Sequence, residues 1–331
     1  MDLIRTDIYG RELGYVLNAN IDFEIGESDN INDFEIEFKR WYWDGSIQYG
    51  SRVYSPNTEY GGIVQEITTD SSANVIRAKG YTWRGMMTKK IIEPLSGQDY
   101  AVASGELNSI IKEKVEKAFP GLFYGVESST KVNVNYQFDR YCTLYEGLRK
   151  MLKSVGYRMN IKYLQGDVGE AGYVRVQAVK INDLSEEYEF TNDNNMTFKT
   201  DDNRRGTNHL ICLGKGELKE RIVIHLYVDK NGNIGQTPYY TGVDEITDVY
   251  DSSGSEYDEL LKNGTEKLNK DKSVMSYDMT MTKIEGVIDI GDIVGGRDYL
   301  TGIAMTKPIS RKIWTISSGK EKIEYKLEGE T

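Results

Sequence analysis

The stretch that decides the fold is Asn57–Pro94, NTEYGGIVQEITTDSSANVIRAKGYTWRGMMTKKIIEP. Gly61 and Gly62 stand at the start of an apolar strand pattern, where a residue without a Cβ lets the backbone bend or approach a neighbour closely. The polar run 70–74 is typical of a hairpin loop. Residues 75–81 then alternate between apolar and charged side chains, as a return strand does. We therefore predict a hairpin here.

Three large apolar side chains follow the hairpin within one helical turn. Trp83, Met86 and Met87 are spaced three and four residues apart, which places them on one side of a helix. Residues 57–94 are thus predicted to form a core-building hairpin with an apolar lid. The stretch contains no histidine and no cysteine, so it does not suggest a reaction centre.

Length, composition and charge narrow the class of protein. A chain of 331 residues is too long for one ordinary hydrophobic core, which predicts two or three domains. Its 24 tyrosines and few prolines favour a folded, β-dominated protein. The net charge of -11 argues against a general nucleic-acid binder, which needs basic patches. It also argues against adhesion to an anionic membrane surface.

Segments that would direct the chain into or across a membrane are not evident. No run of eighteen apolar residues occurs, so we expect no membrane insertion. The first residues, MDLIRTDIYG, lack the apolar core of a secretory signal, and we expect folding in a cytoplasm. Cys142 and Cys212 could pair, but isolated cysteines of this kind are expected to be ordinary buried thiols.

The first 95 residues are predicted to form an all-β unit. Residues 20–26 and 33–39 alternate strictly between apolar and acidic side chains, which predicts two half-buried antiparallel strands. With the hairpin described above, the unit should contain about six strands. A sandwich or a small barrel is the expected architecture.

After Pro94 the pattern changes to a mixture of helices and strands. Apolar residues recur at helical spacing in 104–118, where Ser104 is predicted to be the N-cap, and in 143–154. Strand patterns lie beside these helices at residues 131–138, 157–164 and 173–181. We interpret residues 96–188 as an α+β insert.

From residue 189 the β pattern returns. A helix is predicted within residues 252–271. Strands are predicted at residues 208–213, 217–229, 275–284, 293–297, 303–316 and 322–327. The predicted fold class is α+β and β-dominated, with two β-barrel-like domains, residues 1–95 and 189–331, flanking the insert at 96–188.

Residue types that carry out catalysis or bind metals are scarce. His209 and His225 are far apart in sequence, and each is interpreted as a structural or surface histidine. Zinc-ligand motifs and a nucleophile elbow are absent. We therefore predict no catalytic, cofactor-binding or metal-binding residues, no cofactor and no enzymatic activity, and we leave binding residues unassigned.

Other local motifs have simpler interpretations. Residues 229–233, DKNGN, start like a calcium loop, but the glycine is misplaced, so a hairpin turn is predicted. Residues 214–216, GKG, lack the spacing of a phosphate-binding loop and are interpreted as a turn. Glu186-Glu187 and Asp201-Asp202 could assist glycoside hydrolysis only if brought together in a cleft. The sequons at Asn195 and Asn263 matter only for a secreted protein.

Three short motifs together resemble one family. They are DFEIEF at residues 33–38, GGIVQEI at 61–67 with AKGYTW at 78–83 and KII at 90–92, and IGDIV at 290–294 with KIEYKL at 322–327. In this order they resemble the tail-hub proteins of long-tailed phages. That group includes the structural N-terminal part of tail-associated lysins and the baseplate hubs of contractile tails. Some members have a lytic or receptor-binding extension, which we do not expect in a chain that stops at Thr331.

The resemblance implies a structural role in a virion. Hubs of this family are homotrimeric rings, in which two barrel-like domains per chain match the hexameric tail tube. The implied partners are the tail tube or distal tail protein and a tape measure, tip or spike protein. DNA would pass through the ring without specific binding, and the acidic charge would keep it from adhering. Alternatively, the charge serves solubility alone. The implied location is the tail tip or baseplate, after assembly in the host bacterial cytoplasm.

Two other functions stay open on the sequence. The abundant tyrosine and tryptophan, which stack on sugars, would suit a glycan-binding or cell-wall-degrading tail tip protein. The third possibility is a bacterial effector or secretion-system spike component, which would form the same kind of ring as a hub.

Overall fold

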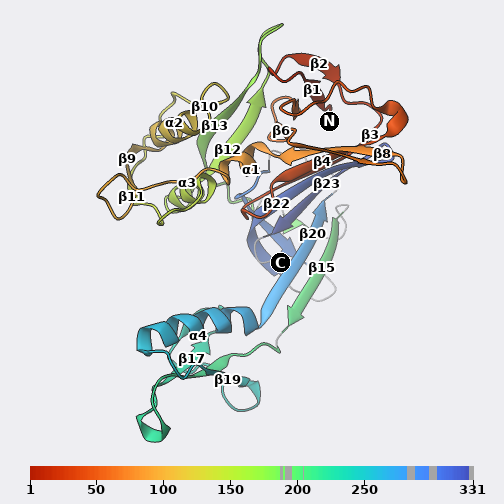
Figure 1. Cartoon of the computed structure of the whole chain (residues 1–331). Coiled ribbons are helices and arrows are strands. Elements are labelled where there is room, and N and C mark those ends of the chain that lie inside the picture. The colour runs from red at the N-terminus through yellow and green to blue at the C-terminus, as the bar shows by residue number, and fades with distance from the viewer. Residues whose placement is uncertain (187–188, 191–195, 204, 282–287, 298–303, 328–331) are drawn as a thin grey trace. The chain divides into compact units, whose positions relative to one another are not determined.

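The computed structural model describes residues 1–186, 189–190, 196–203, 205–281, 288–297 and 304–327. They form two compact units: unit 1 is built from residues 1–198 and 279–328, and unit 2 from residues 199–278 (Figure 1). Strands outnumber helices in the described chain, which confirms the α+β, β-dominated class. The division into three domains at residues 95 and 188 stays a prediction.

The largest sheet belongs to unit 1 and joins distant parts of the chain. Its order is β14-β21-β22-β3-β4-β8-β7, and β23 also pairs with β22. The strands are β3 (Ala19–Gly26), β4 (Asp33–Lys39), β7 (Glu66–Asp70), β8 (Val75–Tyr81), β14 (Glu189–Phe190), β21 (Ile293–Arg297), β22 (Ala304–Ser317) and β23 (Lys320–Leu327). Because β22 pairs antiparallel with β3, the C-terminal strands complete the N-terminal sheet (Figure 1).

Alternating side chains give this sheet one apolar and one acidic face. Phe23 on β3 stacks between Phe34 on β4 and Trp314 on β22, with ring centroids 5.0 and 5.5 Å away. All three rings are buried. The acidic residues of β3 and β4 lie on the opposite face, as the strict alternation predicted.

The stretch 57–94 folds as predicted. Strands β6 (Gly61–Ile63), β7 and β8 are followed by the short helix α1 (Trp83–Met87), whose first turn is capped because the Thr82 hydroxyl accepts the Gly85 N–H. A Cβ on Gly62 would lie 2.2 Å from the backbone oxygen of Tyr81. The glycine is therefore needed for close approach, as inferred from the sequence.

A second sheet of unit 1 has the order β2-β1-β5-β6. Its further strands are β1 (Ile4–Thr6), β2 (Glu12–Tyr15) and β5 (Arg52–Tyr54), and the 3-10 helix η1 (Arg40–Tyr42) lies between β4 and β5. Residues 1–95 thus contain eight strands, more than the six or so expected. These additional strands have three or four residues each, too few to display an alternating pattern.

Helices and strands of residues 96–188 pack on the core around Trp83. They are β9 (Val102–Glu106), α2 (Leu107–Ala118), β10 (Phe123–Gly125), β11 (Asn133–Gln137), α3 (Leu144–Lys153), β12 (Tyr157–Leu164) and β13 (Tyr173–Lys180). They form the sheet β10-β13-β12 and the ribbon β11-β9. The core of this region includes Leu107, Ile111, Leu148, Leu152 and Tyr163.

The predicted N-cap of the first long helix is wrong. Ser104 lies in β9, opposite Asn135 of β11. Helix α2 begins three residues later, where the Glu106 carboxylate accepts the backbone N–H of Ser109 at 3.0 Å. Strand pairing satisfies the backbone of 102–106, and an acidic side chain suits a helix N-terminus. The second helix, predicted over residues 143–154, is α3, and the Thr143 side chain caps it by accepting the Glu146 N–H.

Unit 2 is a four-stranded sheet with one helix packed on it. The sheet order is β18-β17-β16-β19. Its elements are β16 (His209–Leu213), η2 (Leu218–Glu220), β17 (Val223–Val228), β18 (Ile234–Gly235), η3 (Gly242–Asp244), β19 (Thr247–Asp251) and α4 (Tyr257–Asp271). Leu210, Cys212 and Leu226 meet Leu260 and Leu268 in its core. The flanking strands β15 (Met196–Asn203) and β20 (Val274–Met281) pair with each other.

No helix in the described part of the chain is both long and apolar enough to cross a membrane.

Candidate functional site: the acidic face of the large sheet

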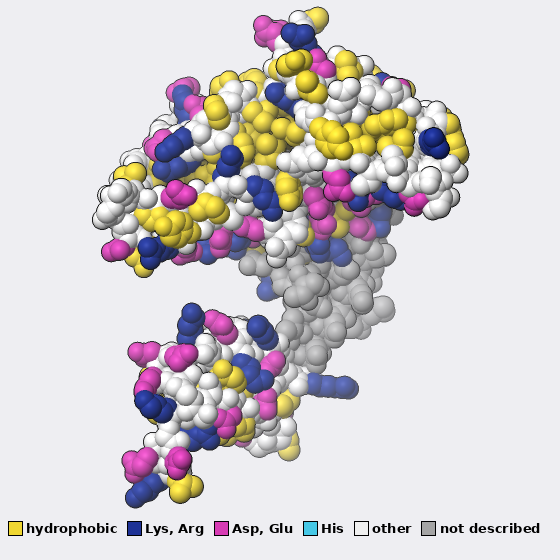
Figure 2. Space-filling view, viewed as in Figure 1, with side chains coloured by type: hydrophobic (Ala, Val, Ile, Leu, Met, Phe, Trp, Pro, Cys, Tyr) yellow, Lys and Arg dark blue, Asp and Glu magenta, His cyan; other side chains and the backbone are white. Residues whose placement is uncertain are grey.

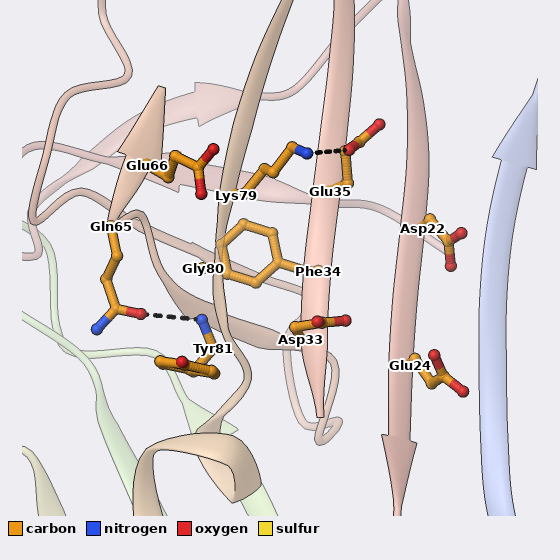
Figure 3. A pocket seen from close by; sticks show the side chains of 10 residues that line it. All are labelled: Asp22, Glu24, Asp33, Phe34, Glu35, Gln65, Glu66, Lys79, Gly80 and Tyr81. Carbon is orange, nitrogen blue, oxygen red and sulfur yellow. Dashed lines mark hydrogen bonds and ion pairs between the residues drawn. The ribbon is translucent and has the colours of Figure 1, made fainter. Parts of the chain in front are cut away.

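The outer face of the large sheet carries a row of carboxylates. Asp22 and Glu24 project from β3, and Asp33 and Glu35 project from β4 (Figure 3). Together with Glu66 at the start of β7 they line an open hollow of about 650 Å³. The strict alternation of the two central strands places these acids here, because the intervening residues enter the core.

Cations on neighbouring strands compensate part of this charge. Asp22 lies directly opposite Glu35 in the strand register, a like-charge pair that costs stability. On β8, Lys79 contacts Glu35 at 2.9 Å, and Arg77 contacts Glu35 at 3.2 Å and Glu37 at 2.6 Å. Glu24 pairs with Arg311 of β22.

Three carboxylates of the hollow form no salt bridge among the described residues: Asp22, Asp33 and Glu66. The Lys79 ammonium still lies near enough to lower the pKa of Asp33. Partial burial raises the pKa of Asp22, and the nearby carboxylates of Glu24 and Asp33 raise it further. Burial and the Glu24 carboxylate likewise raise the pKa of Asp33. Both shifts arise first from burial, which penalises the charged carboxylate, and then from like charges held close together. The face therefore has a negative field that its own cations do not cancel.

The acidic surface extends across β3 toward β22. A second hollow of about 260 Å³ shares Asp22 and Glu35 with the first and reaches Thr315 and Ser317. No group of three or more His, Cys, Asp or Glu suited to a metal ion occurs in the described part of the chain. The arrangement is an extended acidic wall and offers the geometry of a surface that repels anions.

Beneath the same sheet lies a buried network of ion pairs. Lys312 on β22 donates to Asp289, and the Lys312 Nζ lies 3.8 Å from the Glu59 carboxylate. Arg158 on β12 binds Asp292 through two hydrogen bonds of 2.8 Å. These charged side chains are at most about one-tenth exposed. The network ties the large sheet to the insert.

Arg84 of α1 forms the other end of this network. It donates from Nε and Nη2 to the two oxygens of Glu59, at 2.6 and 2.9 Å, and from Nη1 to the Tyr145 hydroxyl at 3.0 Å. Arg84 and Glu59 are only 2% and 3% exposed. Burial raises the pKa of Tyr145 to about 12, so this phenol stays a neutral acceptor at ordinary pH.

Acid is expected to weaken unit 1 by way of Asp289. Burial alone would raise the pKa of this carboxyl, but the Lys312 and Arg158 cations outweigh burial and hold the pKa at about 2. Because this lies below the unfolded value of 3.8, the stabilisation is present above pH 3.8 and is lost as the pH falls toward 2. We expect a loss of about 2 kcal/mol in the free energy of unfolding.

The measurement is a series of urea unfolding curves between pH 5 and pH 2. The sequence has four tryptophans, at positions 41, 43, 83 and 314, all in unit 1, so tryptophan fluorescence reports unit 1. The control is Asp289→Asn, whose curves should change less over this pH range than those of the unsubstituted chain. Equal pH dependence of the two proteins would contradict the assignment.

The two histidines lie together in unit 2. His209 is buried, and its Nε2 lies 2.8 Å from Nδ1 of His225, which is exposed. The other His209 nitrogen lies 2.6 Å from a Glu245 oxygen, and the His209 ring stacks on Tyr227. The sequence did not predict this meeting, because it depends on the pairing of β16 with β17.

The remaining sequence motifs have these outcomes. Cys142 and Cys212 are both free and buried, as expected. Residues 229–233 form the predicted hairpin turn, in which an Asp229 oxygen accepts the N–H groups of Asn231 and Asn233. Residues 214–216 lie in the connection between β16 and β17. Glu187 and Asn195 lie outside the described residues, as do the side chains of 201–202.

Sequence reasoning missed the buried ion network, although a signal was present. Lys312 shares the core-facing side of its strand with Trp314, and Arg84 lies between the apolar residues of α1. A cation at an inward position requires a buried anion. That rule would have pointed to a network, but not to its partners, which come from distant segments.

Two solved structures of tail proteins have the same architecture as this chain. The 43 kDa tail protein of prophage MuSo2 from Shewanella oneidensis matches with a TM-score of 0.54 and 12% identity, over 99% of this chain and 98% of that one. The tail protein from Neisseria meningitidis MC58 matches with a TM-score of 0.52 and 12% identity, over 98% and 95%. The chain has the fold of these tail proteins.

The tail-protein fold covers both units, since almost the full length of the chain is matched. The resemblance to phage tail proteins inferred from three short motifs is therefore confirmed at the level of the fold. No protein-family model and no curated protein sequence matches the chain. At 12% identity the likeness identifies the architecture alone.

Proposed function

We propose that this chain is the structural hub of a phage or phage-like tail. Three copies would form a ring that joins the tail tube to the host-facing tip or baseplate and leaves a channel for DNA. The observation that carries the proposal is the tail-protein fold over nearly the whole chain. The chain acts in this proposal as a building element and catalyses no reaction.

The acidic face of the large sheet supports a role as channel wall. Asp22, Asp33 and Glu66 form no salt bridge among the described residues and face an open hollow (Figure 3). A negative wall repels the DNA backbone, so that DNA passes without adhering. Screening in physiological salt limits this repulsion to roughly 8 to 10 Å from the wall.

The ring requires partners on both sides. The tail tube or distal tail protein would bind one side, and a tape measure, tip or spike protein would bind the other. Free strand edges on the subunits suit such an assembly, because neighbours in a ring can cover them. The proposed location is the virion tail tip or baseplate, after assembly in the host bacterial cytoplasm.

Light scattering coupled to size exclusion tests the ring. We expect a species with three times the mass of the chain, either alone or after mixing with the tail-tube protein. Negative-stain images of that species should show a ring with a central channel. A strictly monomeric chain, even beside the tail-tube protein, would overturn the proposal.

The channel wall is tested in the assembled ring by charge reversal. The triple variant Asp22→Lys/Asp33→Lys/Glu66→Lys should retain double-stranded DNA at low salt, whereas the unsubstituted ring should not. The matched control has the same change in net charge at exposed acids elsewhere: Asp167→Lys/Glu217→Lys/Glu220→Lys. Equal DNA retention by the two triple variants would show that net charge, and not this face, governs the effect.

A glycan-binding or cell-wall-degrading tail tip protein is the alternative. One observation favours it: Trp41 and Tyr42 are 68% and 50% exposed, with ring centroids 6.1 Å apart. Exposed aromatic rings of this kind stack on sugars. Glycan arrays and assays of peptidoglycan hydrolysis separate the two functions, and turnover of peptidoglycan by the purified chain would favour the alternative.

A further inference from the structure

Unit 1 exposes a large apolar surface around its N-terminal strands. We call it the N-terminal patch; its six side chains are between 46% and 68% exposed and are Ile8, Tyr9, Leu13, Tyr15, Leu17 and Tyr49. Leu13 and Tyr15 lie on β2, and Leu17 follows it. Ile8 and Tyr9 lie on the turn before β2, and Tyr49 lies next to Gly50, which approaches Ile8. Contiguous exposed apolar surfaces are uncommon on proteins that act alone.

A free strand edge runs through the N-terminal patch. β2 is the outermost strand of its sheet, and each of its four residues is exposed. Its outer backbone groups therefore have no strand partner in the described chain. A free edge with apolar neighbours favours a partner that supplies an extended strand.

A second apolar surface lies on the insert of the same unit. We call it the insert patch; its five side chains are between 44% and 70% exposed and are Ile91, Leu95, Tyr100, Val102 and Tyr141. The backbone of Ile92 donates to Cys142, and that of Phe138 donates to Ala101, which holds these segments together. Val102 belongs to β9, which pairs only with β11 in the described chain and so leaves its other edge open.

The two patches lie well apart on unit 1. β2 and the pair β9 and β11 are separated in Figure 1, and hydrophobic side chains gather near each of them in Figure 2. A contact between two different patches is head-to-tail. Head-to-tail contacts generate a ring when the rotation closes.

One cation of the N-terminal patch matches two acids of the insert patch. Arg11 stacks on Tyr9 of the N-terminal patch, with its guanidinium 5.9 Å from the ring centroid, and it has no acidic partner in the described residues. Glu93 and Asp99 are exposed beside Leu95 and Tyr100, and neither forms an ion pair within the described chain. Arg140, on the same side, stacks on Tyr141. Opposite charges across a contact set its orientation.

We propose that the N-terminal patch of one copy docks on the insert patch of the next copy, with β2 extending the β9–β11 ribbon along the open edge of β9. This inference rests on the proposed homotrimer and names the surfaces that build it. One type of contact, repeated around the ring, then buries both apolar surfaces and satisfies both open strand edges.

Cysteine cross-linking tests the contact. In the double variant Leu13→Cys/Val102→Cys, mild oxidation of the assembled protein should give covalent dimers and trimers on a non-reducing denaturing gel. Each single variant should stay monomeric on that gel, because a head-to-tail contact brings Leu13 near Val102 and not near its own equivalent. The native Cys142 and Cys212 are buried and should not contribute.

The control is Leu13→Cys/Val243→Cys, whose second cysteine is fully exposed in unit 2 and outside both patches. It should give no ladder. Covalent dimers from a single variant would mean a patch that pairs with itself and would overturn the proposal. If light scattering finds the double variant trimeric and it still gives no cross-links, the proposed contact is overturned. The proposed ring would stand in that case. A monomer by light scattering would remove the ring and this contact together.

Charge substitutions at the same two positions test the contact a second time, with a separate check that each variant folds. Leu13→Asp and Val102→Asp should each reduce trimer formation at least tenfold, while tryptophan fluorescence of unit 1 stays native. The double variant Leu13→Lys/Val102→Asp should recover part of the assembly, because the two new charges are opposite. Undiminished trimers of both single variants would overturn the proposal.

Discussion

Replacing Arg84 by methionine should lower the free energy of unfolding of unit 1 by about 3 to 5 kcal/mol. Arg84 is 2% exposed and makes three hydrogen bonds, two to the Glu59 carboxylate and one to the Tyr145 hydroxyl. Without the guanidinium, the one cation left beside Glu59 among the described residues is the Lys312 ammonium at 3.8 Å. A buried carboxylate with so weak a partner costs far more than the loss of an ordinary contact.

Urea unfolding followed by tryptophan fluorescence measures this loss, because the tryptophans at 41, 43, 83 and 314 all belong to unit 1. The double variant Arg84→Met/Glu59→Leu should recover more than half of it, since an apolar pair leaves no buried charge behind. The surface control is Arg77→Met, which removes the ion pairs of a partly exposed side chain with Glu35 and Glu37 and should cost at most about 1 kcal/mol. Equal losses for Arg77→Met and Arg84→Met would contradict the argument.

Truncating Trp83 to alanine is the second large change, with an expected loss of about 3 to 5 kcal/mol. The ring is fully buried and stacks on Tyr163 of β12, with centroids 5.1 Å apart. It therefore joins the hairpin region to the insert. Removing it leaves a cavity between two parts of the core that cannot collapse independently.

The informative control is Trp83→Phe. The indole Nε1 is buried and has no hydrogen-bond partner among the described residues, so phenylalanine keeps the stacking and loses no hydrogen bond. We expect a loss below about 1.5 kcal/mol, measured by urea unfolding with the fluorescence of the remaining three tryptophans. A loss as large as that of the alanine variant would contradict the argument that ring stacking on Tyr163 stabilises this part of the core.

Long alternating or periodic segments were predictable from the sequence. β12 and β21 have the predicted bounds, and α3 lies within the predicted range 143–154. Local patterns decide such segments, because each side chain faces either the core or water. Short strands such as β1 and β5, with three residues each, carry no such pattern. Their pairing comes from contacts with distant strands.

The candidate site was predictable only in part. The acidic side of β3 and β4 follows from alternation, and the sequence analysis placed those acids in solvent. That Asp22 faces Glu35 across the register, and that Arg311 joins the same surface, depends on the pairing of β22 with β3. At Ser104 the local signal gave a wrong prediction. Serine is a good capping residue, but its backbone pairs with β11 and the helix begins later. Tertiary pairing overrides local preference in each of these cases.

The pairing of β22 with β3 also means that β3 is synthesised long before its partner strand. Glu24 is translated 287 residues before its partner Arg311. At ordinary speeds of translation the newborn chain waits ~15 to 60 s for that partner. Throughout this delay one margin of β3 is uncovered, and all of unit 2 emerges from the ribosome in the meantime. A message truncated before codon 304 would leave that margin uncovered permanently, so its product should be a substrate for chaperones and proteases and not a shorter working subunit.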